Sequence, residues 1–388
     1  MNEREREESL ERAEAMSRGA WVDDDDPRLG RPYVEWAVVR VRIGWALLLA
    51  AIVGLVLLGI SPTPYVVERP GPAYDALGDA PTTEGESAPV IAIDGATTYP
   101  TDGELDLLTV NVAGSPTQTL DWFQVLQAWV DPSQAIAPVD LLFPGDASEQ
   151  DVDEQNAALM RDSQQSAVAA ALGALGIDYG VTVEVGSVAA GSAAEGVLET
   201  GDRLLEVGGR AIRFDTDVRA AVEANGAGTP MTIRVLRGGA PLELEVTPTL
   251  VGGRPLLGIG VTAQYDFPFD VEVRLDDVGG PSAGQIFALG IYDKLTPGAL
   301  LGGAHVAGAG TIAADGEVGA IGGIVQKMYG AQRAGAEWFL APRSNCDEVV
   351  GNVPAGLRVV AVDTLDDSIA ALEAIGQGGD TSVLPSCG

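Results

Sequence analysis

The chain has 388 residues and a formal net charge of −33, from 23 basic and 56 acidic side chains. This length allows two or three domains with sizeable cores. A surface this acidic repels phosphate backbones and anionic lipids, which excludes nucleic acid as a partner. Arginine supplies nearly all of the positive charge, since the only lysines are Lys294 and Lys327. Because a desolvated lysine can lose its proton and act as a base whereas arginine cannot, these two positions are candidates for chemistry.

The N-terminal part of the chain combines a charged tail with an apolar segment. Residues 1–42 are charged and lack an apolar period, which predicts a disordered cytoplasmic tail. Residues 43–60 carry no charge. As a helix they would cover about 27 Å, close to the thickness of a bilayer's hydrocarbon core, so we expect one transmembrane helix here. Val38, Val39 and Val41 can extend it.

The charges around this segment predict its orientation. Four arginines precede it closely, whereas Arg69 is the only basic residue close behind it. The positive-inside rule therefore places the N-terminus in the cytoplasm and everything after Ser61 outside, on a single-pass anchor in the cell membrane. A cleaved signal peptide is disfavoured by the long acidic leader and the lack of an A-x-A site. A buried helix of a soluble protein is disfavoured by the length of the uncharged run.

Residues 61–177 carry short apolar runs separated by Pro, Gly and Asp, followed by a helical pattern from Ser163 to Gly176. Glycine commonly ends a helix, so we expect this one to stop at Gly176. The segment as a whole predicts a small β-rich juxtamembrane region that closes with a helix.

Residues 178–250 alternate strand-like runs with turns around one helical stretch. The pattern G-D-x-[IL]-x-x-V-x-G occurs at Gly201 to Gly209, after GSAAEGVLET and before a closing RVLRGG hairpin. This run resembles a PDZ domain of the protease-associated type. Such domains bind a peptide as an added strand and hold its carboxylate with backbone N–H groups. The resemblance implies peptide binding at Gly180, Val181, Thr182 and Val183, and a spacer without a ligand is the alternative.

The string GGPSAG, Gly279 to Gly284, brings a serine to the expected entry of a helix. Pro281 restricts the backbone conformation directly before the serine, and the glycines permit tight backbone geometry. The free N–H groups of a helix start can stabilise a developing oxyanion, which makes Ser282 a candidate nucleophile. Taken alone, a serine in this position is more commonly a helix cap.

Lys327 lies in GAIGGIVQKMYGA, in the first turns of a helix expected after a Gly-Gly bend. Apolar neighbours such as Ile324 and Met328 predict that its side chain is partly desolvated. Desolvation disfavours the charged form, so the pKa of Lys327 should fall from about 10.4 toward neutral pH. A neutral lysine can take the proton of a serine as histidine does in a triad, so Lys327 is the candidate general base for Ser282.

The pair GGPSAG and GGIVQK resembles the proteolytic domain of the Lon family, which uses the serine of G-P-S-A-G and the lysine of G-G-x-x-x-K. The matching residues are Ser282 and Lys327, 45 positions apart. The resemblance implies an α/β (α+β) Lon-type proteolytic domain, which we expect over residues 251–378 with a tail at 379–388. The order of anchor, β-rich PDZ domain and Lon-type domain is similar to that of the membrane-anchored PDZ–Lon peptidases of bacteria.

Two departures from the Lon pattern concern the surroundings of the site. Lon proteases have a threonine that helps to orient the lysine, and its place falls on Ala309 here. Thr311, two residues further on, shares that strand face and is the candidate substitute. The acidic residue that precedes G-P-S in many Lon enzymes is also absent, and Asp277 is assigned no role.

The ATPase of Lon has no counterpart in this sequence. A Walker A motif needs G-K-[ST], and neither lysine follows a glycine or precedes Ser or Thr. We therefore expect no cofactor and no use of ATP, and substrates that are flexible or already unfolded segments of exported or membrane proteins. The resemblance also implies a homo-oligomer, a hexameric ring.

The remaining candidates receive structural roles. His305, the only histidine, has no base signature around it, which leaves a Ser–His pair as a minor alternative. Lys294 lies at the end of the helix begun by Ser282, where its charge suits the helix dipole. Cys346 and Cys387 are expected outside the membrane, in a disulfide that closes a loop and contributes about 3–4 kcal/mol. One histidine with these cysteines supplies no metal site.

Together these features predict an ATP-independent, membrane-anchored serine endopeptidase whose PDZ domain presents substrate. The alternative is a membrane-tethered PDZ adaptor with a Lon-like domain that does not cleave. It is disfavoured because both dyad residues are present in a chain nearly free of lysine. A signal-peptidase-like Ser–Lys enzyme is disfavoured by the joint occurrence of the two Lon-type strings.

Overall fold

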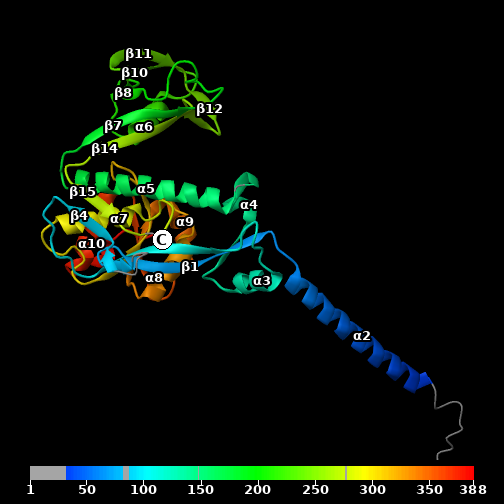
Figure 1. Cartoon of the computed structure of the whole chain (residues 1–388). Coiled ribbons are helices and arrows are strands. Elements are labelled where there is room, and N and C mark those ends of the chain that lie inside the picture. Colours follow the sequence, from blue (N-terminus) through cyan, green and yellow to red (C-terminus); the bar gives the residue numbers. More distant parts are fainter. Residues whose placement is uncertain (1–31, 82–86, 147, 276–277) are drawn as a thin grey trace, which may run out of the picture. The chain divides into compact units, whose positions relative to one another are not determined.

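The computed structural model describes residues 32–388 except 82–86, 147 and 276–277 (Figure 1). The predicted disordered tail lies, up to residue 31, outside the described residues. The chain divides into two units by its internal contacts. The first contains the N-terminal helix with Asp121–Phe123, and the second contains the folded remainder from Pro64 onward.

The N-terminal helix α2 spans Pro32–Ile60, so it begins earlier than the predicted start at residue 43. The charged residues before 43 continue the helix, because an arginine within an apolar run is a good helix former. Val38–Ile60 is the one segment of the described residues that is long and apolar enough to cross a membrane, with a mean hydropathy of 2.7. At about 1.5 Å per residue its 23 residues cover about 35 Å.

A six-stranded sheet in the order β20-β19-β16-β5-β1-β6 forms the centre of the second unit. Its strands are β1 (Tyr65–Asp75), β5 (Glu104–Ala113), β6 (Ala135–Pro138), β16 (His305–Gly308), β19 (Trp338–Pro342) and β20 (Arg358–Val362). Strands β5, β16, β19 and β20 are parallel to one another, whereas β1 runs antiparallel to both β5 and β6.

Helices cover both faces of this sheet (Figure 1). One face packs against α5 (Glu149–Ala174), α7 (Gly284–Leu295) and α10 (Leu365–Gly376). The other face packs against α8 (Ile324–Ala334). Successive side chains of a strand point to opposite faces, so Leu105 and Leu107 of β5 join the first core and Leu108 joins the second.

The expected juxtamembrane region at 61–177 is therefore not a separate module. Its strands β1, β5 and β6 lie in the same sheet as the C-terminal strands, and its helix α5 packs on α7. The sequence pattern misses this because the partners are about 200 residues apart, and local periodicity carries no information on long-range strand pairing.

Shorter elements complete this part of the chain. They are α3 (Trp122–Val130), α4 (Val139–Leu142), α9 (Cys346–Val349), β2 (Asp79–Pro81), β3 (Ser87–Pro89), β4 (Ile91–Asp94), β15 (Asp270–Val273), β17 (Thr311–Ile312), β18 (Val318–Gly319) and the 3₁₀ turns Pro144–Asp146, Arg343–Asn345 and Thr381–Val383. Strands β15 and β4 pair across a long stretch of sequence. Strands β2 and β3 form a local hairpin, and so do β17 and β18.

A second sheet, in the order β11-β10-β8-β7-β14, carries its own apolar core. Its strands are β7 (Gly180–Val188), β8 (Arg203–Val207), β10 (Met231–Arg237), β11 (Ala240–Val246) and β14 (Ile259–Asp266), with the short β9 (Arg210–Ala211) beside β8. Helix α6 (Asp215–Asn225) and the hairpin of β12 (Thr249–Val251) and β13 (Arg254–Leu256) accompany it. Because β14 belongs to this sheet, the domain extends past the expected end at residue 250.

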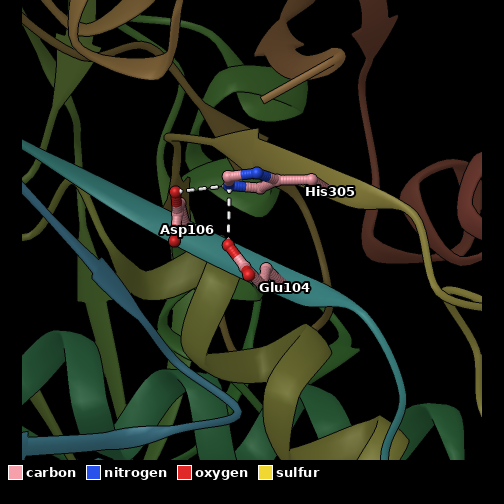
Figure 2. Close-up of side chains that lie close together, drawn as sticks. All are labelled: Glu104, Asp106 and His305. Carbon is pink, nitrogen blue, oxygen red and sulfur yellow. Dashed lines mark hydrogen bonds and ion pairs between the residues drawn. The ribbon is translucent and has the colours of Figure 1, made fainter. Parts of the chain in front are cut away.

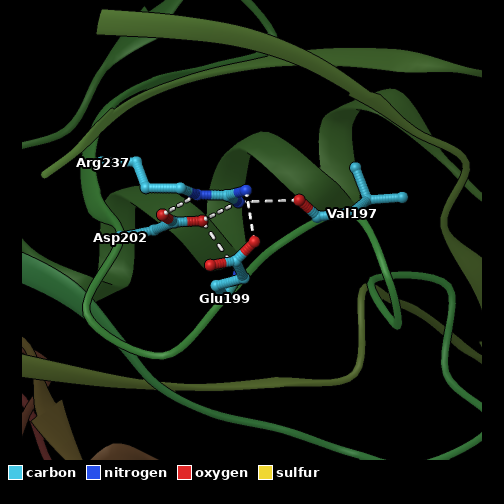
Figure 3. A network of polar contacts seen from close by, with 4 residues as sticks. All are labelled: Val197, Glu199, Asp202 and Arg237. Carbon is cyan, nitrogen blue, oxygen red and sulfur yellow. Dashed lines mark hydrogen bonds and ion pairs between the residues drawn. The ribbon is translucent and has the colours of Figure 1, made fainter. Parts of the chain in front are cut away.

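An ion-pair network fixes the turn that enters β8 in this second sheet (Figure 3). Asp202 is almost fully buried and accepts two hydrogen bonds from the Arg237 guanidinium, at 2.7 Å each. Arg237 also donates to the Glu199 carboxylate and to the Val197 carbonyl. Bidentate contacts of this kind are strong because the planar guanidinium matches the carboxylate. Hydrogen bonding to Arg237 lowers the pKa of the Asp202 carboxyl.

We expect Asp202→Asn to destabilise this domain by about 2–4 kcal/mol, because a buried guanidinium contact loses its charged partner. The lowered pKa means that the stabilisation is present above the unfolded-state pKa and is lost as pH falls through the folded-state pKa. Urea denaturation followed by circular dichroism at pH 7 and pH 3 measures both effects. Arg274→Ala, which removes an exposed pair with Glu272, is the control and should change stability by less than about 0.5 kcal/mol.

Candidate active site

The structure brings Ser282 and Lys327 together. The Nζ atom of Lys327 lies 2.6 Å from the Oγ atom of Ser282, within hydrogen-bonding distance. Ser282 lies two residues before the start of α7, and Lys327 lies in the first turn of α8. The two helices pack on opposite faces of the central sheet, and the contact joins residues 45 positions apart beside β5, beyond the stretch that pairs with β16.

Helix α5 holds the loop that carries Ser282. The carbonyl of Asn156 accepts a hydrogen bond from the Gly280 amide, and the Ser163 hydroxyl donates to the Pro281 carbonyl. Gly280 adopts φ +83°, which favours glycine. A Cβ atom on Gly284 would lie 2.5 Å from Ser163 Oγ and 2.8 Å from Ile312 Cγ2, so only glycine fits this contact between loop, α5 and β17.

The loop is also fixed from the side of β17. The Gly310 amide donates to the Ser282 carbonyl at 2.9 Å, and the Gly310 carbonyl accepts from the Gln285 amide at 3.1 Å. These two backbone hydrogen bonds hold Ser282 and Gln285 against Gly310. The Ser282 hydroxyl takes part in neither of them.

A second loop positions Lys327. Gly323 precedes α8 in the left-handed region, with φ +68°, and its carbonyl accepts the Lys327 amide. The buried Asn345 side chain accepts from the Ile321 amide and donates to the Ile321 carbonyl. These two hydrogen bonds hold Ile321, the residue directly before the Gly-Gly bend. The backbone that leads into α8 and to Lys327 is therefore fixed.

The surroundings of Lys327 favour its neutral form. Its side chain is only 3% exposed, and the neighbouring Ile324 and Met328 are fully buried. No carboxylate lies within ion-pair distance of Lys327 in the described part of the chain. Burial therefore lowers the pKa of Lys327 to about 8. The amine can then accept the Ser282 proton near physiological pH.

The dyad lies in a cleft of ≈ 330 Å³. Among the described residues, the amides of Ser282 and Ala283 have no hydrogen-bond acceptor, so both are available to a developing oxyanion. One wall of the cleft is formed by β5, at Thr109, Val110 and Asn111. Strand β5 pairs with β16 only from Glu104 to Leu107, which leaves this stretch with an open edge within the described residues.

Thr311, the candidate for orienting the lysine, lies in β17 and pairs with Gly319 of β18. Within the residues that the structure describes it makes no hydrogen bond with Lys327, and its hydroxyl lies against Gly319. Ala309, the position of the Lon threonine, is buried in the same core cluster as Ile324 and Met328 of α8. The face of the strand that approaches α8 is therefore apolar at this position.

His305 lies in a different cluster, with Asp106 and Glu104 at the start of β5 and β16 (Figure 2). Its Nε2 atom is 2.7 Å from Asp106 Oδ2 and 3.3 Å from Glu104 Oε2. These are the only three side chains of the described residues that converge as metal ligands would. A separation of 2.7 Å is that of a direct hydrogen bond, so the histidine itself satisfies the carboxylates. Among the described residues, the His305 ring bonds to Asp106 and no hydrogen bond joins it to Ser282, so the geometry gives no support to a Ser–His pair.

The other predicted residues have structural positions. Lys294 lies in the last turn of α7, as expected, and donates to the Leu77 carbonyl at 3.1 Å. The structure pairs Cys346 with Cys387 in a disulfide whose Cα atoms are 4.9 Å apart. Cys346 begins α9, directly after the Asn345 that holds the lysine loop, so the disulfide connects the C-terminal tail to the same region.

The predicted peptide-binding strand is not at the edge of its sheet. Gly180, Val181, Thr182 and Val183 of β7 pair with β14 along their whole length. The edge strand is β14, and a groove of ≈ 340 Å³ lies between it and α6. The groove is lined by Val218 and Val222 of α6 and by Leu256, Ile259 and Val261 beside β14. The strand expected to pair with a peptide is instead paired with β14, which completes the module beyond its expected end.

Sequence reasoning missed the residues that hold the site. Asn156 and Ser163 lie about 120 residues before the serine loop, on a helix that was expected to belong to another region. Gly310 gave a signal in the string GAGTI, since a glycine within a strand pattern marks a close backbone approach.

The fit around Gly284 is open to a direct test. We expect Gly284→Ala to lower peptidase activity at least about tenfold, because the new methyl group must displace Ser163 or Ile312 and shift the Ser282 loop. Gly173→Ala, in α5 with no atom within 4 Å of the added Cβ, is the matched control and should leave activity unchanged while stabilising the helix by up to about 1 kcal/mol. Casein cleavage and thermal unfolding of both variants measure the difference.

Comparisons with known proteins place two domain families on this chain. Residues 152–247 match the PDZ domain model, and residues 277–374 match the model of the Lon protease (S16) C-terminal proteolytic domain. The chain is 34% identical over 111 residues to the Lon protease of Campylobacter concisus and 32% identical over 123 residues to that of Haemophilus influenzae. These alignments cover 28% and 30% of this chain, but only 14% and 15% of the two relatives.

Solved structures match the other domain. The PDZ domain of the SdrC-like protein from Listeria innocua is 24% identical, with 21% of this chain and 92% of that chain covered and a TM-score of 0.20. Its counterpart from Listeria monocytogenes is 25% identical, with 20% and 85% covered and a TM-score of 0.20. The family models confirm the predicted resemblances: this chain carries a PDZ domain followed by a Lon-type proteolytic domain.

Proposed function

We propose that the chain is a membrane-anchored serine endopeptidase in which Ser282 is the nucleophile and Lys327 is the general base. The observation that carries the proposal is the 2.6 Å contact between a serine at the mouth of a cleft and a buried lysine of lowered pKa. The Lon-type proteolytic domain supports a serine peptidase over other uses of such a pair.

The geometry supports a two-step acyl transfer. Neutral Lys327 takes the Ser282 hydroxyl proton as Oγ bonds to the carbonyl carbon of the scissile peptide. The carbonyl oxygen becomes an oxyanion, to which the Ser282 and Ala283 amides can donate. The lysine ammonium then gives its proton to the leaving amine as the C–N bond breaks, leaving an acyl-enzyme. Water repeats the sequence, with Lys327 taking its proton and returning it to Ser282.

Strand β5 offers a track for the substrate. An extended peptide can pair with the open edge at Thr109–Asn111, which places its backbone in the cleft beside Ser282. Such pairing requires a segment without structure of its own. We therefore propose flexible or unfolded segments of exported or membrane proteins as substrates, cleaved without ATP.

The membrane anchor and the assembly are parts of the same proposal. Helix α2 supplies a span of sufficient length, and the arginines before it favour a cytoplasmic N-terminus with both domains outside. Assembly as a homo-oligomeric ring rests on the resemblance to Lon alone, and the mass of the detergent-solubilised protein tests it.

The PDZ domain is proposed to hold a carboxy-terminal peptide in the groove between β14 and α6. In the described structure the amides of Leu257 and Gly258 have no hydrogen-bond acceptor, and they lie at the end of this groove. Backbone amides in such a loop can bind a terminal carboxylate, while the apolar groove accepts the side chains before it.

Substitution of the dyad tests the proposed chemistry. In the full chain in detergent, Ser282→Ala and Lys327→Met should each lower casein cleavage without ATP by at least about 10³-fold. Lys294→Met changes the only other lysine and should keep activity within about threefold. Activity that survives in Lys327→Met would sink the lysine-base mechanism, and a parent protein that cleaves no substrate would favour the PDZ adaptor.

The pH dependence tests the role of Lys327 separately. Because the neutral amine is the active form, kcat/KM should rise about tenfold per pH unit below about 8 and level off above it. The unfolded chain keeps the lysine proton up to about 10.4, so this residue makes folding stability rise with pH between about 8 and that value. Lys327→Met should be more stable than the parent at pH 7 by about 1–3 kcal/mol. A flat pH–rate profile across pH 7–9 is the contrary result.

The PDZ groove is tested with peptides. A peptide with an apolar free C-terminus should bind at least about tenfold more tightly than its C-terminal amide, as fluorescence anisotropy measures. Leu256→Asp places a negative charge in the groove and should weaken binding by a similar factor. Leu250→Asp lies on the other strand of the same hairpin, outside the groove, and is the matched control. Equal affinity for acid and amide would contradict carboxylate recognition.

A further inference from the structure

Helix α3 carries several large apolar side chains that remain exposed on one side of the helix. Its sequence is WFQVLQAWV, and five large apolar side chains are exposed: Trp122, Phe123, Leu126, Trp129 and Val130. Trp129 is 76% exposed and Val130 is 70% exposed. At 3.6 residues per turn, these five positions fall within an arc of about 120°, which we call the outer face of α3.

The opposite side of α3 already has its partners. Val125 and Ala128 are buried in a small core with Val67 and Leu120. The helix therefore packs into this core without using the side chains of its outer face. The helix also contains no charged residue, in a chain in which 20% of residues are charged. A contiguous exposed patch of large apolar side chains typically marks an interaction site.

The start of α3 is attached to the end of the membrane-spanning segment. Asp121, directly before α3, forms a β-bridge with Pro62, two residues after α2 ends. A Cβ atom on Gly59 would lie 2.8 Å from the ring of Phe123, so this ring rests on the last turn of α2. Where α2 spans a bilayer, Phe123 is thus at the level of the outer boundary of the hydrocarbon.

We propose that the outer face of α3 lies in the interfacial region of the same bilayer that α2 spans, as a second membrane contact. Tryptophan and phenylalanine favour this region, and an amphipathic helix buries its apolar face there. The nine residues of α3 extend only about 14 Å from the attachment, so the whole face stays within reach of the surface. The inference rests on the proposed anchoring by α2.

The absence of charge on α3 identifies the type of lipid surface. The helix has no lysine or arginine to attract anionic headgroups, and the chain as a whole is negative. Contact is therefore driven by burial of apolar side chains, and it requires no anionic lipid. Zwitterionic phosphatidylcholine is a sufficient surface.

Three single-cysteine probes in the full chain test the proposal. Leu48→Cys lies in the span, Leu126→Cys on the outer face, and Leu250→Cys on the exposed hairpin of the PDZ domain. The native cysteines are paired with each other, so a thiol-reactive nitrobenzoxadiazole dye labels only the introduced residue. The protein is reconstituted in phosphatidylcholine vesicles, and quenching by lipids with a nitroxide near the headgroup or deep in the chain is measured.

We expect the shallow nitroxide to quench the Leu126 probe at least about threefold more than the Leu250 probe, and the deep nitroxide to quench the Leu48 probe. A Leu126 probe that behaves like Leu250 while Leu48 is quenched overturns the α3 contact and leaves the anchor intact. An unquenched Leu48 probe overturns the anchor, and the α3 contact with it. A Leu126 signal that appears only with anionic lipid contradicts the apolar mechanism.

Substitutions on the helix separate membrane contact from simple proximity. Trp129→Gln combined with Val130→Gln should lower the quenching of the Leu126 probe at least about twofold, because the apolar face loses its most exposed side chains. Gln127→Ala, an exposed change outside this face, is the matched control and should have no effect. Unchanged quenching in the double variant, with circular dichroism showing an intact fold, rejects the face as the contact.

Discussion

Lys327 is 3% exposed and has no carboxylate partner in the described structure, so burial penalises its charged form and lowers its pKa to about 8. The free energy for this comes from the packing of α8, whose Ile324 and Met328 are fully buried beside it. The low-dielectric environment that costs stability also makes the amine a base. Stability and reactivity at Lys327 are thus opposed consequences of one physical cause, as is common at active sites.

The proposed base can act only if Ser282, the proposed nucleophile, is held in place. The Ser282 loop receives hydrogen bonds from or donates them to α5 on one side and Gly310 on the other. Glycine at 284 lets the backbone come so close to α5 and β17 that a methyl group would not fit. The site is therefore preorganised by rigid elements, and the serine side chain needs no large motion to reach the lysine.

Strand β5 connects the site with the rest of the second unit. Its first half is paired on both sides and is closed at its start by the Asp106–His305 contact. Its second half is paired only with β1, which leaves the edge beside the dyad open to a peptide. Open strand edges invite pairing with other chains, and here the exposure coincides with the cleft. Strand β5 thus contributes side chains to the apolar cores and is also the strand with which the substrate is proposed to pair.

Several features of this protein are local in the sequence and follow from it directly. The apolar run of α2, the two Lon-type strings and the PDZ pattern each occupy a short stretch, so composition and spacing identified them. The scarcity of lysine singled out Lys327, because a residue type used only twice is seldom there for solubility alone.

What only the tertiary structure decided depends on contacts between distant segments. The place of β1, β5 and α5 beside the C-terminal strands, the hold of Asn156 and Ser163 on the serine loop, and the addition of β14 to the PDZ sheet all join residues far apart in the chain. The groove proposed to hold a peptide therefore lies beside β14 and not beside β7. Strand order is set by which apolar faces bury each other best, and a linear pattern does not encode that choice.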